Sequence, residues 1–232
     1  MNSDDFLNHY NLIDNFLRKD NGHGPEVSFT QKIKLSSNKT VKRYKDDLLS
    51  LGELRNAIVH NPKIGNKVIA EPHDETVRRI KDLYEKITNP KRVIPTFQSE
   101  ILGAFEDDYI NNILSEMKIK SISQFPVFNN EQIVIELINT NTISRWLSTQ
   151  LEEKGTIIVE KIRVKDLISS IEFQNNYRFI SRTASIYDAY DHFITHINTH
   201  KRNLDLLFIT ETGKKSERLL GLVTIEDIAS SL

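Results

Sequence analysis

Two stretches of eight residues, one in each half of the C-terminal region, decide the fold of this chain. Residues 221–228 read GLVTIEDI and residues 136–143 read ELINTNTI, and the two align without a gap. Around each stretch, short apolar runs and short helical patterns follow one another in the same order. The sequence therefore predicts an internal duplication of a strand–helix–strand–strand–helix unit.

The pattern changes near Asn89-Pro90, which we take as the boundary between two regions. Before it, apolar residues recur at steps of three and four, which predicts four helices in a small bundle. One of these helices is predicted to begin at Thr40 as N-cap and to end before Pro62. The predicted parts are a helical bundle over residues 1–90, a first copy over 91–152 that starts with a strand at 92–97, a connector over 153–172 and a second copy over 173–232.

The composition excludes several classes of protein. The 232 residues include no cysteine, which rules out disulfides, thiolate metal sites and cysteine nucleophiles. No run of eighteen apolar residues occurs, so no membrane span is predicted. The N-terminus carries Asp4 and Asp5 where a secretory signal has a basic segment, and we expect a cytoplasmic protein.

Residues 221–228 resemble the end of a CBS repeat, in which a glycine and two apolar residues precede a threonine or serine and, three residues later, an aspartate. The resemblance covers about residues 91–232 and implies an α+β fold with a tandem CBS pair after the helical bundle. It also implies a regulatory adenine nucleotide such as AMP, ADP, ATP or a related compound. In the family, the matching residues approach the ligand phosphate (Thr224) and the ribose hydroxyls (Asp227), with Ser181 and Thr183 as secondary contacts.

The residue chemistry of Thr224 and Asp227 leaves two interpretations open. A threonine that ends a strand and an aspartate one turn later place a hydroxyl and a carboxylate at a helix N-terminus, where free N–H groups favour phosphate. The same two residues can instead form an ordinary capping box, in which Thr224 is the N-cap and Asp227 reaches back to it.

The first copy departs from the CBS pattern at each informative position. Glu136 replaces the glycine, Asn139 the threonine and Thr142 the aspartate. A glutamate near ligand phosphates would repel them. We therefore expect one competent nucleotide cleft, governed by Thr224 and Asp227.

In the helical region, Arg55, Asn56 and His60 match the arginine–polar–x–x–x–histidine motif of HEPN ribonucleases. The resemblance covers about residues 1–88 and implies metal-independent cleavage of RNA by the paired motifs of a homodimer. On one regular helix Arg55 and His60 lie about 140° apart, so we expect a composite site across a two-fold axis. Arg55 would bind the phosphate and His60 would transfer protons. The alternative is that Arg55 pairs with an acid and His60 only ends the helix.

A basic run lies beside this motif. Residues 1–90 carry a net charge of about +2 and residues 91–232 about −3, and residues 31–45 hold six basic residues and no acid. Such a run can contact RNA phosphates, although a solvated helix face is the alternative. The residues assigned to RNA binding are Lys39, Lys42, Arg43 and Lys45.

Three histidines, His192, His196 and His200, recur every fourth residue. Neighbouring histidines on a helix can bind zinc, but the apolar stripe of this predicted helix lies nearly opposite them. We expect these side chains to face solvent and expect no metal site.

Together these features predict a nucleotide-regulated endoribonuclease that acts as a homodimer and requires no metal or cofactor. The alternative is a non-enzymatic nucleotide sensor whose helical domain serves dimerisation or docks a protein partner.

Overall fold

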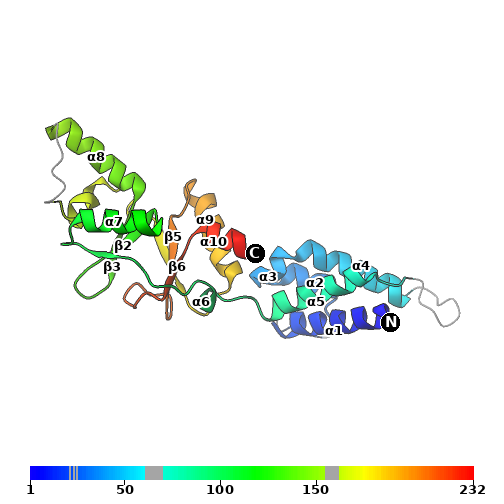
Figure 1. Cartoon of the computed structure of the whole chain (residues 1–232). Coiled ribbons are helices and arrows are strands. Elements are labelled where there is room, and N and C mark those ends of the chain that lie inside the picture. The colour runs from blue at the N-terminus through cyan, green and yellow to red at the C-terminus, as the bar shows by residue number, and fades with distance from the viewer. Residues whose placement is uncertain (21, 23, 25, 61–69, 155–161) are drawn as a thin grey trace. The chain divides into compact units, whose positions relative to one another are not determined.

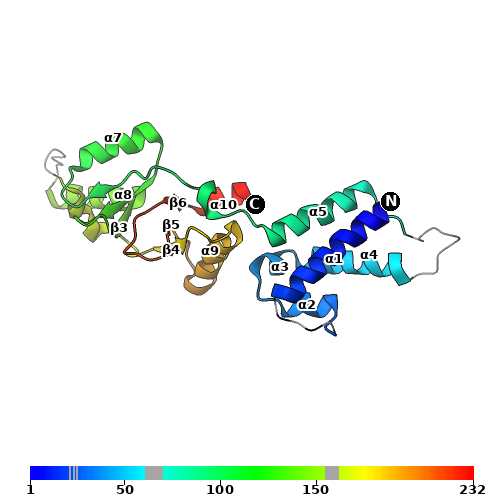
Figure 2. The same ribbon diagram turned by 90° about the horizontal axis from the view of Figure 1, so that it is seen from below.

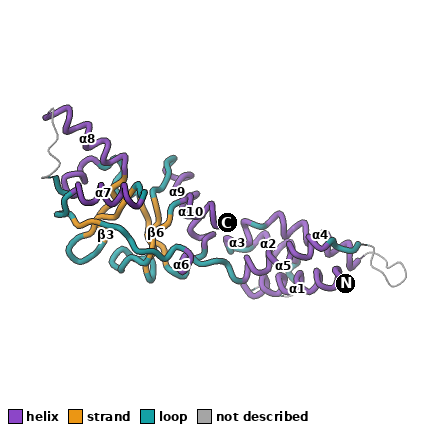
Figure 3. The backbone as a smooth tube through the Cα atoms, viewed as in Figure 1, coloured by secondary structure: helices purple, strands orange, loops and turns teal. Residues whose placement is uncertain are grey.

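We describe the fold from a computed structural model, which describes residues 1–20, 22, 24, 26–60, 70–154 and 162–232. The chain divides into two compact units, Met1–Lys91 and Arg92–Leu232, and each is described by itself. Figures 1 and 3 show helices in both units and, among the described residues, strands in the second unit alone. This mixed composition agrees with the predicted α+β class. Within the described residues, no helix has the length and apolar character needed to cross a membrane.

The first unit is helical and packs around one apolar core. In Figures 1 and 2, α1 and α5 run side by side, and both helices contribute to this core. The helices are α1 (Asn2–Asp20), α2 (Phe29–Leu35), α3 (Lys39–Arg43), α4 (Lys45–His60) and α5 (Asp74–Thr88). The largest fully buried side chains of the core are Phe6, Ile13, Leu17, Ile33, Leu48, Ile80 and Ile87.

The helix predicted from Thr40 onward is in fact two helices. Asn38 is the N-cap, because its Oδ1 accepts hydrogen bonds from the backbone N–H groups of Thr40 at 3.0 Å and Val41 at 3.2 Å. Tyr44 then breaks the helical conformation and separates α3 from α4. The prediction missed this because Thr40 is itself a common capping residue. The predicted stop at Pro62 lies outside the described residues.

The second unit contains the duplicated unit. Each copy has the order strand, helix, strand, strand, helix, and each forms a three-stranded sheet in which the first strand is parallel and the third antiparallel to the second. The first copy comprises β1 (Ala104–Phe105), α7 (Ile110–Lys120), β2 (Gln124–Phe128), β3 (Val134–Asn139) and α8 (Thr140–Lys154). The second comprises β4 (Tyr177–Ser181), α9 (Ile186–His200), β5 (Leu206–Thr210), β6 (Gly221–Val223) and α10 (Ile225–Ser231).

Two further elements flank these copies, α6 (Val93–Thr96) and a 3₁₀ helix, η2 (Val164–Ser170). The predicted strand at residues 92–97 is therefore wrong, because α6 occupies this stretch and the first strand begins at Ala104. Val93 and Ile94 are both buried in α6. Consecutive buried apolar residues do not distinguish a short strand from a short helix.

The segment of chain that leads into each copy contacts the third strand of the other copy. We call residues 97–103 and 171–176 the lead-in segments of the first and second copies. Gln98 forms an antiparallel bridge with Gly221 in β6. In the matching position of β3, the carboxylate of buried Glu136 accepts hydrogen bonds from the backbone N–H of Asn175 at 3.1 and 3.2 Å. The two contacts join equivalent positions, since Gly221 and Glu136 align in the sequence.

The glycine of GLVTIEDI has a structural reason. A Cβ atom on Gly221 would lie 2.2 Å from the backbone oxygen of Phe97, a distance that real side chains do not reach. Glycine is therefore needed where the first lead-in segment crosses β6.

We predict that Gly221→Ala destabilises the second unit by about 2–3 kcal/mol, because the added methyl group forces backbone apart. Urea denaturation followed by circular dichroism measures this change. Ser99→Ala, at an exposed position of the same lead-in segment, is the control and should leave stability unchanged. Equal stability of the Gly221→Ala variant and the native chain would contradict the close contact.

Candidate functional site

Thr224 and Asp227 form a reciprocal capping box at the start of α10. The Asp227 Oδ2 atom accepts hydrogen bonds from the backbone N–H and from the hydroxyl of Thr224, both at 2.8 Å, while the Asp227 N–H approaches Thr224 Oγ1 at 3.4 Å. The capping interpretation is therefore realised in this structure. Asp227 is exposed and Thr224 half-buried, so a ligand can still reach both side chains.

Ser181 and Thr183 lie at the other end of the sheet from Thr224. Ser181 pairs with Thr210 at the end of β5, whereas Val223 pairs with Leu207 near its start. Thr224 is thus about four residues, or roughly 13 Å, away from the level of Ser181 along the strands. The structure does not bring the four residues predicted to bind nucleotide into one cleft.

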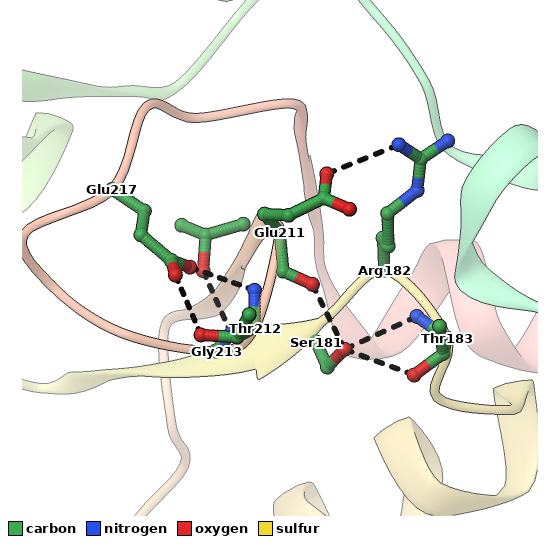
Figure 4. Close-up of polar contacts among 8 residues, drawn as sticks. Ser181, Arg182, Thr183, Glu211, Thr212, Gly213 and Glu217 are labelled. Atoms are coloured by element: carbon green, nitrogen blue, oxygen red, sulfur yellow. Dashed lines mark hydrogen bonds and ion pairs between the residues drawn. The ribbon is translucent and has the colours of Figure 1, made fainter.

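The hydroxyls of Ser181 and Thr183 instead take part in a network that holds the loop after β5 (Figure 4). Ser181 Oγ lies 3.0 Å from Thr183 Oγ1 and donates to the backbone oxygen of Glu211 at 3.1 Å. Beside them, Arg182 pairs with the Glu211 carboxylate at 3.0 Å. These contacts are structural, since they join the end of β4 to the loop.

Glu217 closes the same loop. Its carboxylate accepts hydrogen bonds from the Thr212 hydroxyl at 2.5 Å, the Thr212 N–H at 2.7 Å and the Lys214 N–H at 3.4 Å. These bonds, the one from the Thr212 hydroxyl above all, lower the pKa of the Glu217 carboxyl to about 2. The carboxylate of the chain itself thus fills a cluster of donors that would otherwise suit an anion.

Glu136 in the first copy is hydrogen-bonded to the backbone of its own chain. It is buried, and besides Asn175 its carboxylate accepts a hydrogen bond from the backbone N–H of Leu137 at 2.9 Å. The repulsion of ligand phosphates by Glu136 stays a prediction, and the structure adds a structural role for this carboxylate. Sequence alone could not show this, because Asn175 is 39 residues away along the chain.

A cavity of about 270 Å³ lies beside Asn139 and Thr142, between the two copies. Asn139 Oδ1 accepts from the Thr142 N–H at 2.9 Å and from its hydroxyl at 3.1 Å, so the earlier residue of this pair is the acceptor, whereas in the second copy the later residue, Asp227, accepts from Thr224. The cavity is also lined by Glu172 at the end of the connector, which accepts a hydrogen bond from Asn141 at 3.0 Å, and by polar side chains of the second copy, namely Asn176, Arg202, Asn203 and Asp205.

The cavity contains a half-buried carboxyl group and an unpaired buried amide oxygen. Burial raises the pKa of the Asp205 carboxyl, while hydrogen bonds from Asn176 and Asn139 and the charge of Arg202 oppose this shift. Asn176 is 4% exposed, and its Oδ1 has no hydrogen-bond partner in the described part of the chain. Such an acceptor is costly unless a water or ligand satisfies it.

An aromatic ring and a guanidinium group form another side of this cavity. The Arg202 Cζ atom lies 4.3 Å from the centroid of the Phe173 ring, and Phe173 is 44% exposed. The sequence interpretation missed Phe173, Asn176, Arg202 and Asp205 as site residues. The sequence did carry a signal for this cavity. Asparagines directly precede β4 and residues 202–205 directly precede β5, and polar side chains at the starts of two paired strands lie close together.

In the helical unit, Arg55 reaches His60 within one chain. Arg55 Nη1 lies 2.8 Å from His60 Nε2 and donates to Asn56 Oδ1 at 3.2 Å. A guanidinium group can only donate, so His60 Nε2 is the acceptor in this contact. The expectation that one helix keeps Arg55 and His60 apart is wrong, because the long arginine side chain spans the angle between them. Asn56 and His60 are exposed and Arg55 is half-buried.

The residues predicted to bind RNA lie on the surface of the same unit. Lys39, Lys42 and Arg43 are in α3 and Lys45 is the first residue of α4, and all four are exposed. The structure thus leaves both interpretations of the basic run in place.

The histidine prediction is wrong for one member. His196 is 4% exposed and stacks on His200, with ring centroids 4.2 Å apart. Burial, then the charges of His200, Arg178 and Arg202, lower the pKa of His196. Over the ranges that the structure describes, no cluster of three side chains could hold a metal ion.

The comparisons with known proteins find similar folds and no similar sequence. No family model matches the chain, and no curated protein matches it. Solved CBS-domain structures do match it. The CBS domain of a membrane protein from Sphaerobacter thermophilus is 14% identical, with a TM-score of 0.46, and the match covers 68% of this chain and 96% of that one.

Two further matches are of the same kind. A CBS domain pair in complex with 5′-methylthioadenosine and S-adenosyl-L-methionine is 13% identical over 61% of this chain and 95% of that one, with a TM-score of 0.43. A CBS-domain protein from Agrobacterium tumefaciens is 13% identical over 57% and 84%, with a TM-score of 0.38. At these identities and TM-scores we base no functional statement on the likeness.

We predict that Glu217→Gln lowers the stability of the second unit at neutral pH. The folded pKa of about 2 lies below the usual value of 4.5, so the ionised carboxylate stabilises the fold fully above pH 4.5 and loses this effect as the pH falls from 4.5 toward 2. Urea denaturation at pH 7, 4.5 and 3 should show a difference between native and variant that shrinks with acid. Glu131→Gln, at an exposed turn, is the control; a constant difference at all three values would refute the assignment.

Proposed function

We propose that this chain is an adenine-nucleotide-binding regulatory protein. The observation that carries the proposal is the cavity of about 270 Å³ whose polar lining comes from both copies of the duplicated unit. This volume lies just below the range of about 300–1,000 Å³ for small-molecule sites, and we infer that the cavity takes only the nucleoside part of a ligand. The resemblance of residues 221–228 to CBS repeats supports the same ligand class.

The lining offers the groups that a nucleoside needs. The Asp205 carboxylate and the Asn176 Oδ1 atom are acceptors for ribose hydroxyls or for the exocyclic amine of adenine. The Phe173 ring, with Arg202 above it, is a surface on which a planar base can stack. Thr224 and Asp227 remain a second candidate site for the ligand. Ser181 and Thr183 are not part of this site, because the strand register places them at the other end of the sheet.

Regulation follows from the shared lining. A ligand that touches Asn139 and Thr142 in one copy and Asp205 in the other binds well only when the two copies keep this arrangement. Its binding therefore shifts the protein toward that arrangement, in proportion to the difference in affinity.

We expect AMP, ADP or ATP to raise the unfolding temperature of the native protein, by an amount that grows with ligand concentration. Asp205→Asn should weaken binding about 10-fold, because a charged acceptor is lost. Differential scanning fluorimetry and isothermal titration calorimetry measure both effects, with Asp82→Asn in the helical unit as the matched control.

The same titration on Asp227→Asn separates the two clefts. Loss of binding in Asp227→Asn alone would move the site to Thr224 and Asp227. Absence of any response to all three nucleotides would remove the proposed function.

A second function is favoured by the contact between Arg55 and His60, which holds a cation and a proton acceptor together at an exposed helix end. We propose that this pair cleaves RNA in a homodimer. Arg55 would turn its donors to the phosphate, and His60 Nε2 would take the proton of the 2′-hydroxyl as its oxygen attacks phosphorus. The protonated His60 would then give this proton to the 5′-oxygen as the bond between phosphorus and the 5′-oxygen breaks, and a 2′,3′-cyclic phosphate would remain. Lys39, Lys42, Arg43 and Lys45 would hold the strand.

We predict that Arg55→Ala/His60→Ala abolishes RNA cleavage in EDTA, with a loss of at least about 100-fold. Gel analysis of a labelled RNA, with and without AMP, ADP and ATP, measures the rate, and Lys81→Ala is a control in the same unit. Nucleotide binding without cleavage by the native protein would instead identify a non-enzymatic sensor whose helical unit serves dimerisation or partner docking.

A further inference from the structure

The second unit contains another cavity, of about 390 Å³, which lies within the range of about 300–1,000 Å³ for small-molecule sites. We call it the phenylalanine cavity. Its lining comes from the first lead-in segment, from β1 and β2, from the turn after β2 and from the loop between β5 and β6. Among the described residues it shares none with the cavity beside Asn139, and neither Thr224 nor Asp227 lines it.

Phe105 and Phe128 form an apolar wall of this cavity. Their ring centroids lie 6.2 Å apart at an interplanar angle of 51°, and Phe105 is 40% exposed. The Phe128 ring lies directly on the backbone of the first lead-in segment, since a Cβ on Gly103 would be 2.1 Å from Phe128 Cε2. An exposed aromatic ring beside a second ring is a surface that an apolar ligand group can cover.

Two opposite charges line the same cavity. Glu100 and Arg218 are both exposed, and neither forms a hydrogen bond or an ion pair with any residue that the structure describes. The two acids of the neighbouring loop differ, because Glu211 pairs with Arg182 and Glu217 accepts from Thr212. A free carboxylate and a free guanidinium group complement a ligand that carries both an ammonium and a carboxylate group.

The loop that carries Arg218 is held on both sides of this residue. Before it, Glu217 is bound to the Thr212 hydroxyl and N–H, as Figure 4 shows. After it, the Leu220 N–H donates to the backbone oxygen of Ile209 at 2.8 Å. The backbone position of Arg218 at the cavity is therefore fixed, and only its side chain has to adjust to a ligand.

Gln132 adds an uncharged donor and acceptor to the lining. It lies in the turn between β2 and β3, where Asn129 Oδ1 accepts hydrogen bonds from the N–H groups of Glu131 at 3.0 Å and Ile133 at 2.9 Å. This turn is thus ordered by its own side chain, and it presents Gln132 at a defined place.

We propose that the phenylalanine cavity binds a free α-amino acid with an apolar side chain. The side chain lies on Phe105 and Phe128, the ammonium group on Glu100 and the carboxylate on Arg218. A residue inside a peptide carries neither of these two charges, so the ligand is the free amino acid. The proposal goes beyond the nucleotide site and the ribonuclease and depends on neither, because this cavity has its own lining.

The test is a titration of the native full-length protein with L-phenylalanine and L-leucine. Four analogues each lack one feature: 3-phenylpropionate has no ammonium group, phenethylamine no carboxylate, N-acetylphenylalanine amide neither charge, and glycine no side chain. Each analogue should bind at least about 10-fold more weakly than phenylalanine. Calorimetry measures the amino acids, and ligand-observed NMR the weaker analogues.

Two variants exchange one charge each. Arg218→Gln should weaken phenylalanine binding at least about 10-fold and leave phenethylamine unchanged, whereas Glu100→Gln should weaken phenylalanine and leave 3-phenylpropionate unchanged. Misfolding cannot produce this reciprocal selectivity. Lys214→Gln and Glu131→Gln, at exposed positions outside the lining, are the matched controls and should change no affinity.

A third variant, Phe105→Ala, removes part of the apolar wall and should weaken phenylalanine about 10-fold. The proposal is overturned if neither phenylalanine nor leucine binds the native protein. It is also overturned if 3-phenylpropionate or phenethylamine binds as tightly as phenylalanine, because one of the two charges then has no role. Phenylalanine binding that Arg218→Gln and Glu100→Gln leave unchanged would likewise place the ligand elsewhere and refute the site.

Discussion

The contact on which the second unit depends is the crossing of each lead-in segment over the third strand of the other copy. In one crossing, backbone meets backbone at Gly221, and the absence of a side chain makes it possible. In the other, the buried carboxylate of Glu136 binds the crossing chain through the Asn175 N–H. The equivalent crossings of the two copies are thus accommodated in different ways. One position has no side chain, and the other has a charged side chain that binds the crossing backbone.

The cavity between the copies follows from the second crossing. Asn175 is held by Glu136, and the next residue, Asn176, lines the cavity with an unpaired oxygen. Glu136 has its oxygens committed to backbone N–H groups, so its charge is compensated where it is buried. The residue that made the first copy look unfit for a ligand is therefore the one that positions part of its cleft.

The duplication and the mixed helix and strand composition were predictable, because periodicity and an aligned eight-residue stretch are local properties. The details that failed depend on contacts between distant residues or on side-chain length. The structural role of Glu136 was missed because Asn175 is remote in sequence, and the separation of Arg55 from His60 was misjudged because a helical angle ignores the reach of arginine. His196 was placed in solvent by the same kind of angle, although its neighbours bury it. The lining residues of the cavity between the two copies lie on several elements, and no single sequence pattern joins them.

The ion pair between buried Lys32 and half-buried Asp14 has a consequence for the packing of the helical unit. A buried lysine charge left without its partner is costly, so this contact tolerates little change in geometry. The pair spans α1 and α2, the two helices that also carry Tyr10 and Phe29. It therefore works as a spacer of fixed length, which sets the separation of the two aromatic rings more firmly than apolar packing by itself would.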